Sequence, residues 1–117
     1  GGSQGILRAG RVADRDAVLD ETAPLPAPVS SLDEIVLAMP RQTRLRPDPA
    51  LGFHLYGTDL ALAAENAGLT ALAIDAPCHH NSQQGNELPA AFHSSAEVLR
   101  GRWPERLPLA TPCMLLR

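Results

Sequence analysis

A chain of 117 residues is long enough for one small domain that buries about two-thirds of the surface of its unfolded chain. Its net charge of −3 gives no electrostatic reason to expect binding to nucleic acid or to an anionic membrane. We find no apolar run near the roughly eighteen residues of a membrane span, no leader pattern and only 2 cysteines, so we expect a cytoplasmic protein without a disulfide framework.

The first part of the chain, residues 1–28, is expected to be an extended or flexible segment that precedes a domain over 29–117. Residues 1–5 are small or polar, and the prolines between residues 22 and 28 bias the chain away from helix. Asp14 and Asp16 form an Asp-x-Asp pattern, which can hold a divalent cation. Because nothing before it is long enough for the expected strand and βαβ unit, a solvated loop is favoured over a metal site.

A strand is predicted for Leu32–Met39, and Pro40 ends it. The stretch that follows contains Arg41, Arg44 and Arg46, with Asp48 just beyond them. Clustered guanidinium groups can bind phosphates through paired donors. The alternative, which we favour, is a solvated turn beside Asp48.

A helix followed by a short strand is predicted within residues 52–82. Thr58 can cap the helix with its hydroxyl group, and Asp59 then lies in the first turn, where the helix dipole favours a negative charge. An apolar face at helical spacing follows, and Gly68 is a natural left-handed stop. Leu69–Ile74 reads most simply as a buried strand, and a polar turn with two adjacent histidines comes after it. The helical face is made by Leu60, Ala63, Ala64 and Ala67.

The C-terminal part begins with a polar loop over 81–87, which we expect to be mobile. Pro89 suits the first turn of a second helix, which Gly101 is expected to end. Beyond it, a proline-broken tail is expected to wrap over the core with Trp103 as its anchor. One face of this helix is marked by Phe92, Ser95, Ala96 and Leu99.

Residues 52–62 have the sequence Gly-Phe-His-Leu-Tyr-Gly-Thr-Asp-Leu-Ala-Leu. They are followed by Ala-x-x-Ala-Gly-Leu and by a strand that ends in a His-rich turn. This pattern resembles part of a known enzyme family. It resembles the C-terminal, acceptor-side half of family-2-like glycosyltransferases of the GT-A fold. Residues 32–41 resemble the preceding strand and residues 46–51 the link between them, so the resemblance covers about 29–82. It implies an α/β domain, loop- and proline-rich, with a small mixed sheet and two main helices.

The resemblance also implies roles for individual residues. Transfer of a sugar to a hydroxyl group needs a carboxylate to accept the proton, and it needs a positive group, usually a metal, to stabilise the departing diphosphate. Asp59 matches the family's acceptor-side base, and His80 or His79 matches a position that completes the coordination of Mn²⁺ or Mg²⁺. His54, Tyr56 and Arg41 are then expected to contact substrate, which is a nucleotide-sugar or its hydroxyl acceptor.

Each of these residues also has a purely structural alternative. Asp59 can serve as a charge at the start of a helix, the histidines can be surface turn residues, and Tyr56 can fill a gap. The nucleotide-binding half of a GT-A enzyme is absent from this chain. We therefore expect weak metal binding and no transfer activity for the chain alone.

Three functions remain open at this point. The chain can be part of a glycosyltransferase, a non-catalytic binding or assembly module that keeps the fold, or a small metal-binding protein that uses His54, Asp59, His79 and His80. The spacing of these four residues matches no standard zinc pattern. An exposed apolar sheet face or edge is expected to drive formation of a homo-oligomer or association with a missing half. Leu115 and Leu116, or the strand Ile35–Met39, are the expected contact residues.

Overall fold

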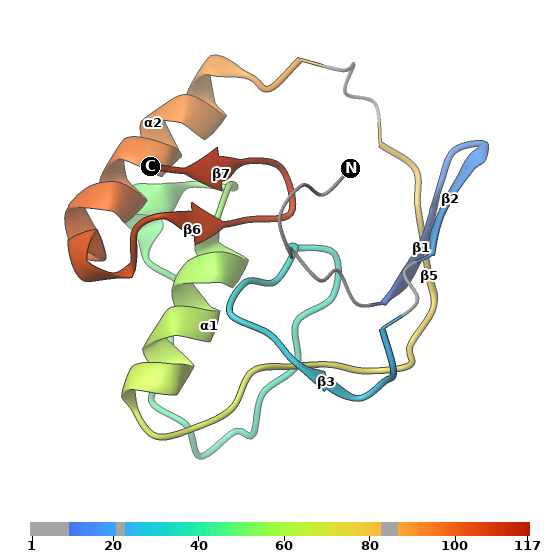
Figure 1. Cartoon of the computed structure of the whole chain (residues 1–117), viewed down its shortest axis with the longest axis horizontal. Helices are drawn as coiled ribbons and strands as arrows, with labels where there is room; N and C mark the ends of the chain where they lie inside the picture. Colours follow the sequence, from blue (N-terminus) through green and yellow to red (C-terminus); the bar gives the residue numbers. More distant parts are fainter. Residues whose placement is uncertain (1–9, 21–22, 83–86) are drawn as a thin grey trace.

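The computed structural model describes residues 10–20, 23–82 and 87–117. Within these ranges the chain forms a small mixed α/β structure with two main helices and three small sheets (Figure 1), as the expected fold class requires. The elements in chain order are β1 (Arg11–Asp14), β2 (Ala17–Asp20), β3 (Ala27–Pro28), η1 (Pro49–Leu51), α1 (Tyr56–Asn66), β4 (Leu72–Ala73), β5 (Cys78–His80), α2 (Ala90–Arg102), η2 (Pro104–Arg106), β6 (Leu109–Ala110) and β7 (Leu115–Leu116).

The largest sheet has the strand order β2-β1-β5, and we call it the outer sheet. β1 runs antiparallel to β2 and parallel to β5, with Val12 beside Cys78. No residue of this sheet whose exposure is described is fully buried. The other two sheets are antiparallel pairs, β3 with β4 and β6 with β7. Figure 1 shows the outer sheet on one side of the molecule and both helices on the other.

The helix α1 begins earlier than the sequence pattern predicts. It starts at Tyr56, after Leu55 in a left-handed conformation with φ of 64°. Thr58 is therefore inside the helix rather than its cap, and its hydroxyl group lies 2.8 Å from that of Ser31. The N–H of Gly57 donates to a carboxylate oxygen of Glu34 at 2.9 Å, so a side chain from a distant segment satisfies one of the free donors at the helix start.

The ends of the two helices test the glycine predictions. Gly68 has φ of 77° and follows the end of α1, as its predicted role as a left-handed stop requires. Gly101 does not end α2, because the helix continues to Arg102 and Trp103 lies at its C-cap. The predicted apolar face of α2 is confirmed, since the residues buried on it are Phe92, Ser95, Ala96 and Leu99.

The hydrophobic core lies between the helices and the β6–β7 pair. Its buried members come from η1, the residue that precedes α1, the two helices and the C-terminal strands: Leu51, Leu55, Leu62, Phe92, Ala96, Leu99, Leu109 and Leu116. Trp103 packs against this cluster, as expected for the anchor of the tail. Leu116 is fully buried within the chain, whereas Leu115 is 37% exposed. A contact with another chain near these residues, or near Ile35–Met39, stays a prediction.

Two predicted strands differ from the structure. Residues 32–39 form no strand, because among the described residues no neighbouring strand pairs with them. The side chain of Glu34 connects this segment to the start of α1 instead. The predicted strand Leu69–Ile74 is shorter than expected and is not buried. Only Leu72 and Ala73 pair in a sheet, and Leu72 is 44% exposed.

Some expectations fall outside the described residues, namely those for residues 1–5 and for most of the polar loop over 81–87. Of the helices in the described ranges, none combines the length and apolar character that a membrane crossing requires.

Candidate functional site

The residue predicted as a catalytic base, Asp59, lies in the first turn of α1 and is only 1% exposed. The indole N–H of Trp103 donates to its Oδ1 atom at 2.7 Å. Arg102 forms an ion pair with the same oxygen, with its Nε atom 3.0 Å away. Asp59 therefore ties the start of α1 to the end of α2.

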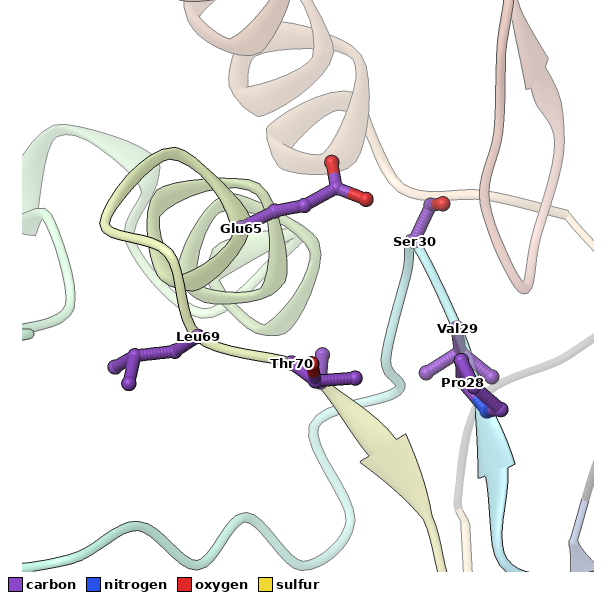
Figure 2. Close-up of a pocket in the computed structure, with 7 residues that line it drawn as sticks. Pro28, Val29, Ser30, Glu65, Leu69 and Thr70 are labelled. Atoms are coloured by element: carbon purple, nitrogen blue, oxygen red, sulfur yellow. The ribbon is translucent and has the colours of Figure 1, made fainter.

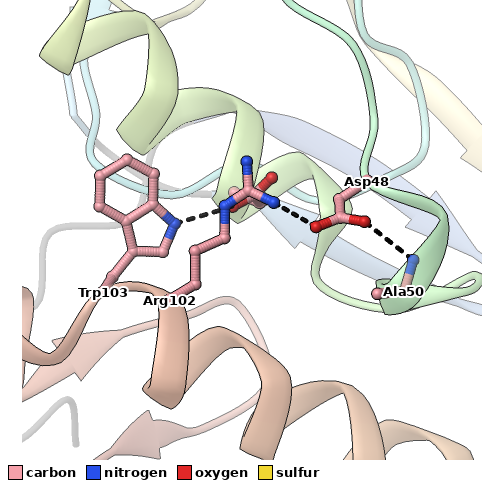
Figure 3. Close-up of polar contacts among 5 residues, drawn as sticks. Asp48, Ala50, Arg102 and Trp103 are labelled. Atoms are coloured by element: carbon pink, nitrogen blue, oxygen red, sulfur yellow. Dashed lines mark hydrogen bonds and ion pairs between the residues drawn. The ribbon is translucent and has the colours of Figure 1, made fainter.

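Arg102 also reaches a second carboxylate, as Figure 3 shows. Its guanidinium group pairs with Oδ2 of Asp48, while Oδ1 of Asp48 accepts the N–H of Ala50 at 2.9 Å and caps η1. One arginine thus connects the three helical elements η1, α1 and α2. We call Asp48, Asp59, Arg102 and Trp103 the Asp59 cluster.

The two carboxylate oxygens of Asp59 have different surroundings within the Asp59 cluster. Oδ1 of Asp59 accepts both polar contacts, and Oδ2 is buried without a hydrogen-bond partner among the described residues. A general base must come within hydrogen-bond reach of the proton it accepts. In this conformation the Asp59 carboxylate is closed to solvent and its contacts are with the chain itself. Its role as a base is not tested by this arrangement and stays a prediction.

The predicted substrate-contacting residues near Asp59 pack against the protein itself. The ring of His54 meets the ring of Phe92 edge-on, with centroids 5.7 Å apart. Tyr56 is partly buried against the hydrophobic core. Their predicted contact with substrate is not tested by this arrangement and stays a prediction.

The predicted metal ligands His79 and His80 lie on β5, which Figure 1 shows on the side of the molecule opposite the helices. Successive residues of a strand point to opposite faces, so the two imidazole rings do not converge. Nδ1 of His80 is 3.9 Å from Oδ1 of Asp14, a residue of the Asp-x-Asp pattern. Among the described residues, no group of three or more His, Cys, Asp or Glu side chains is arranged to hold a metal ion.

Asp14 makes its strongest contacts with Ser82. Its carboxylate accepts the Ser82 N–H at 3.0 Å and the Ser82 hydroxyl at 2.9 Å. The backbone bond is the main cause that holds the pKa of the Asp14 carboxyl below its ordinary value, and the Ser82 hydroxyl, Arg15 and His80 act in the same direction. Asp14 therefore fastens the chain after β5 to the β1–β2 hairpin.

Arg41 lies in the exposed loop that was weighed as a phosphate-binding cluster. Arg44 is exposed as well, and Arg46 folds back to donate to the carbonyl oxygens of Thr43 and Leu45. Asp48, which follows this turn in the sequence, pairs with Arg102. The loop keeps its positive charge at the surface, and a role for Arg41 in substrate binding stays a prediction.

A shallow hollow of about 150 Å³ lies between the end of α1 and the β3–β4 pair (Figure 2). Glu65 extends over one side of it, and its carboxylate also pairs with Arg106. Such a hollow is smaller than the roughly 300–1,000 Å³ of typical small-molecule sites. Its lining residues are Pro28, Val29, Ser30, Glu65, Leu69, Thr70 and Ala71.

Sequence reasoning missed Arg102 and Glu34 as partners of α1. A signal for Arg102 was available, because a buried helix-start carboxylate such as Asp59 needs a cation and Arg102 lies next to the only tryptophan of the chain. Glu34 was assigned to a strand, so its side chain was not considered as a helix cap. Its burial raises the pKa of the Glu34 carboxyl, although the bond from Gly57 acts in the opposite direction.

Comparison with known proteins gives one partial similarity. A Fuscovulum blasticum protein described as "ATP synthase subunits region ORF 6" is 47% identical over 57 residues. The aligned part makes up 48% of this chain and 23% of that relative, so the chain spans about a quarter of the relative's length. No protein-family model matches the chain, and no solved structure matches it.

These comparisons overturn the resemblance to a glycosyltransferase. The similarity found carries a different description, and neither the sequence families nor the solved structures give a glycosyltransferase match. The identification of the chain as the acceptor-side half of a GT-A enzyme is therefore wrong. The motif over 52–62 instead encodes the tight turn before α1 and the buried first turn of that helix.

Proposed function

We propose that this domain is a binding or assembly module, which acts by holding another protein chain rather than by catalysing a reaction. The observation that carries the proposal is that a carboxylate is buried inside the domain while large apolar side chains are exposed on its surface. The most buried carboxylate, Asp59, is used for internal contacts, whereas several large apolar side chains are left in solvent.

The exposed apolar side chains lie on different parts of the surface. Phe53 is 89% exposed, and Val18, Val36 and Ile74 are each more than half exposed. Single apolar residues are ordinary on protein surfaces, but large side chains close together are typical of sites where another protein binds. Ile74 and Leu72 meet this second condition, because they stand two residues apart on and beside β4.

Site-specific photo-crosslinking in the cells that make this chain tests the proposal. A photoreactive residue replaces Phe53 or Ile74, and a control carries it at Gln42, which is exposed and polar. A binding module gives a discrete adduct, of whatever mass, from an apolar position and none from the control. If neither apolar position gives an adduct above the control, the domain does not work by holding a protein partner.

A further inference from the structure

The hollow between the end of α1 and the β3–β4 pair has one carboxylate and two hydroxyl groups among its lining side chains. Figure 2 shows the Glu65 side chain reaching from α1 toward Ser30, which lies across the hollow. Oε2 of Glu65 pairs with Arg106, and the described residues give Oε1 no partner. The hydroxyl groups of Ser30 and Thr70 take part in no hydrogen bond within the described part of the chain. The lining therefore leaves three oxygen atoms free to accept from a donor.

The remaining lining side chains are apolar, and the hollow is small. They belong to Pro28, Val29, Leu69 and Ala71. A volume of about 150 Å³ is below the roughly 300–1,000 Å³ of typical small-molecule sites, so the hollow suits the end of one long side chain better than a whole ligand. Lysine combines an apolar stem, which packs on apolar surface, with a charged end that needs acceptors.

The contacts of Glu65 favour an ammonium group over a guanidinium group. A guanidinium group binds a carboxylate best when it pairs with both oxygens, and Arg106 already uses Oε2 of Glu65. An ammonium group carries three donors on one nitrogen atom, which match Oε1 of Glu65 and the two hydroxyl groups. The net charge of −3 also favours a cationic partner over an anionic one.

We propose that this hollow is a recognition pocket for a lysine side chain of a partner protein. The pocket rests on the proposed binding function and names the chemistry of the partner. The chain contains no lysine, so a second copy of the chain cannot supply this side chain. Leu72 is 44% exposed and lies two residues after Thr70, where it offers the partner an apolar contact beside the hollow.

Butylammonium, which reproduces the end of a lysine side chain, is the probe for a direct test. The purified chain is titrated with butylammonium chloride at constant ionic strength, and its backbone amide signals are followed by NMR. We expect saturable shifts at the amides of Leu69, Thr70 and Ala71. Butylguanidinium is expected to bind there at least about threefold more weakly, and uncharged butanol is expected to give no saturable shift.

Replacing the carboxylate of the hollow tests the role of Glu65. Glu65→Gln keeps the size of the side chain and is expected to weaken butylammonium binding at least about threefold, since an exposed charge pair is lost. Glu97→Gln is the matched control, because Glu97 is also a helical glutamate paired with an arginine, Arg100, and does not line the hollow. The control is expected to bind butylammonium as tightly as the parent.

Three results would overturn the lysine pocket. The first is a parent chain whose Leu69, Thr70 and Ala71 amides show no saturable shift with butylammonium. The second is equal binding of butylguanidinium or butanol by the parent, a comparison that does not depend on the folding of any variant. The third is an equal effect of Glu65→Gln and Glu97→Gln on butylammonium binding.

The crosslinking experiment separates this inference from the proposed function. At the apolar position that gives an adduct, Glu65→Gln is expected to lower the adduct yield at least about threefold and Glu97→Gln to leave it unchanged. Equal yields in the two variants, or an adduct with a second copy of the chain, overturn the lysine pocket and leave the binding function standing. If no adduct forms at Phe53 or Ile74, both proposals fail.

Discussion

Gly57 packs so closely against Leu32 that a Cβ atom at residue 57 would lie 2.6 Å from the Leu32 carbonyl oxygen. The approach brings Glu34 within reach of the Gly57 N–H, so an irregular segment and the start of α1 form one unit. The glycine is required here by space rather than by a left-handed backbone, since its φ is not positive.

Gly57→Ala is therefore expected to destabilise the protein by about 1–3 kcal/mol, the usual cost of overpacking. Gly101→Ala is the matched control, because residue 101 is also helical and a Cβ there meets nothing within 4 Å. The control is expected to gain about 0.5–1 kcal/mol from its better helix propensity. Urea unfolding of both variants measures the difference, and equal effects at the two positions would contradict the close approach.

Trp103→Phe keeps most of the packing of the ring but removes the indole N–H that Asp59 accepts. A hydrogen bond to a charged group contributes about 1.5–3 kcal/mol, and we expect a loss of stability of that size. Arg106→Ala is the control, because it removes a partly exposed ion pair with Glu65, where a loss of at most about 1 kcal/mol is expected. A Trp103→Phe variant as stable as the parent in chemical unfolding would show that the indole hydrogen bond to Asp59 contributes little to the fold.

The lowered pKa of Asp14 predicts a dependence of stability on pH. Because the folded state holds this proton less tightly than the unfolded state, the stabilising contribution is present above the ordinary value of 3.8 and is lost as pH falls through the folded pKa. Asp14→Asn is thus expected to be less stable than the parent at neutral pH. The two proteins should converge in acid, and a difference that stays constant across pH would contradict the assignment.

The contribution of Glu34 to stability is expected to change with pH in the opposite direction to that of Asp14. Burial raises the pKa of its carboxyl above the ordinary 4.5, so its stabilising contribution is complete below that value and is lost as pH rises through the folded pKa. Glu34→Gln keeps an oxygen that accepts the Gly57 N–H but does not ionise. As pH rises, the free energy of unfolding of this variant should increase relative to that of the parent. A relative decrease would contradict the effect of burial on Glu34.

Local sequence patterns predicted the features that depend on neighbouring residues. The buried face of α2 follows from helical spacing, and the stop after α1 follows from Gly68. The start of α1 was predicted wrongly from Thr58, because the residue that binds the helix N–H, Glu34, comes from elsewhere in the chain. A pattern confined to a few residues does not contain that partner.

The strands and the candidate site also depend on residues that are distant in the sequence. Ala27 pairs with Ala73, and strands this short owe their existence to a distant partner rather than to their own pattern. For the site, the position of Asp59 in the first turn was predicted, but its contacts with Arg102 and Trp103 depend on the packing of α1 against α2. Motif similarity over 52–62 was a poor guide to the family of the chain.

Amide hydrogens of the outer sheet are expected to exchange with solvent faster than those of the hydrophobic core. Pairing β1 with β5 closes a long loop from Val12 to Cys78, yet the described residues of the sheet bury no side chain fully in return. Such a sheet opens by local fluctuation at little free-energy cost, whereas amides near Leu62 and Leu99 exchange only when the core itself unfolds. A protease added under native conditions would accordingly cut at the β1–β2 hairpin well before it reached either helix.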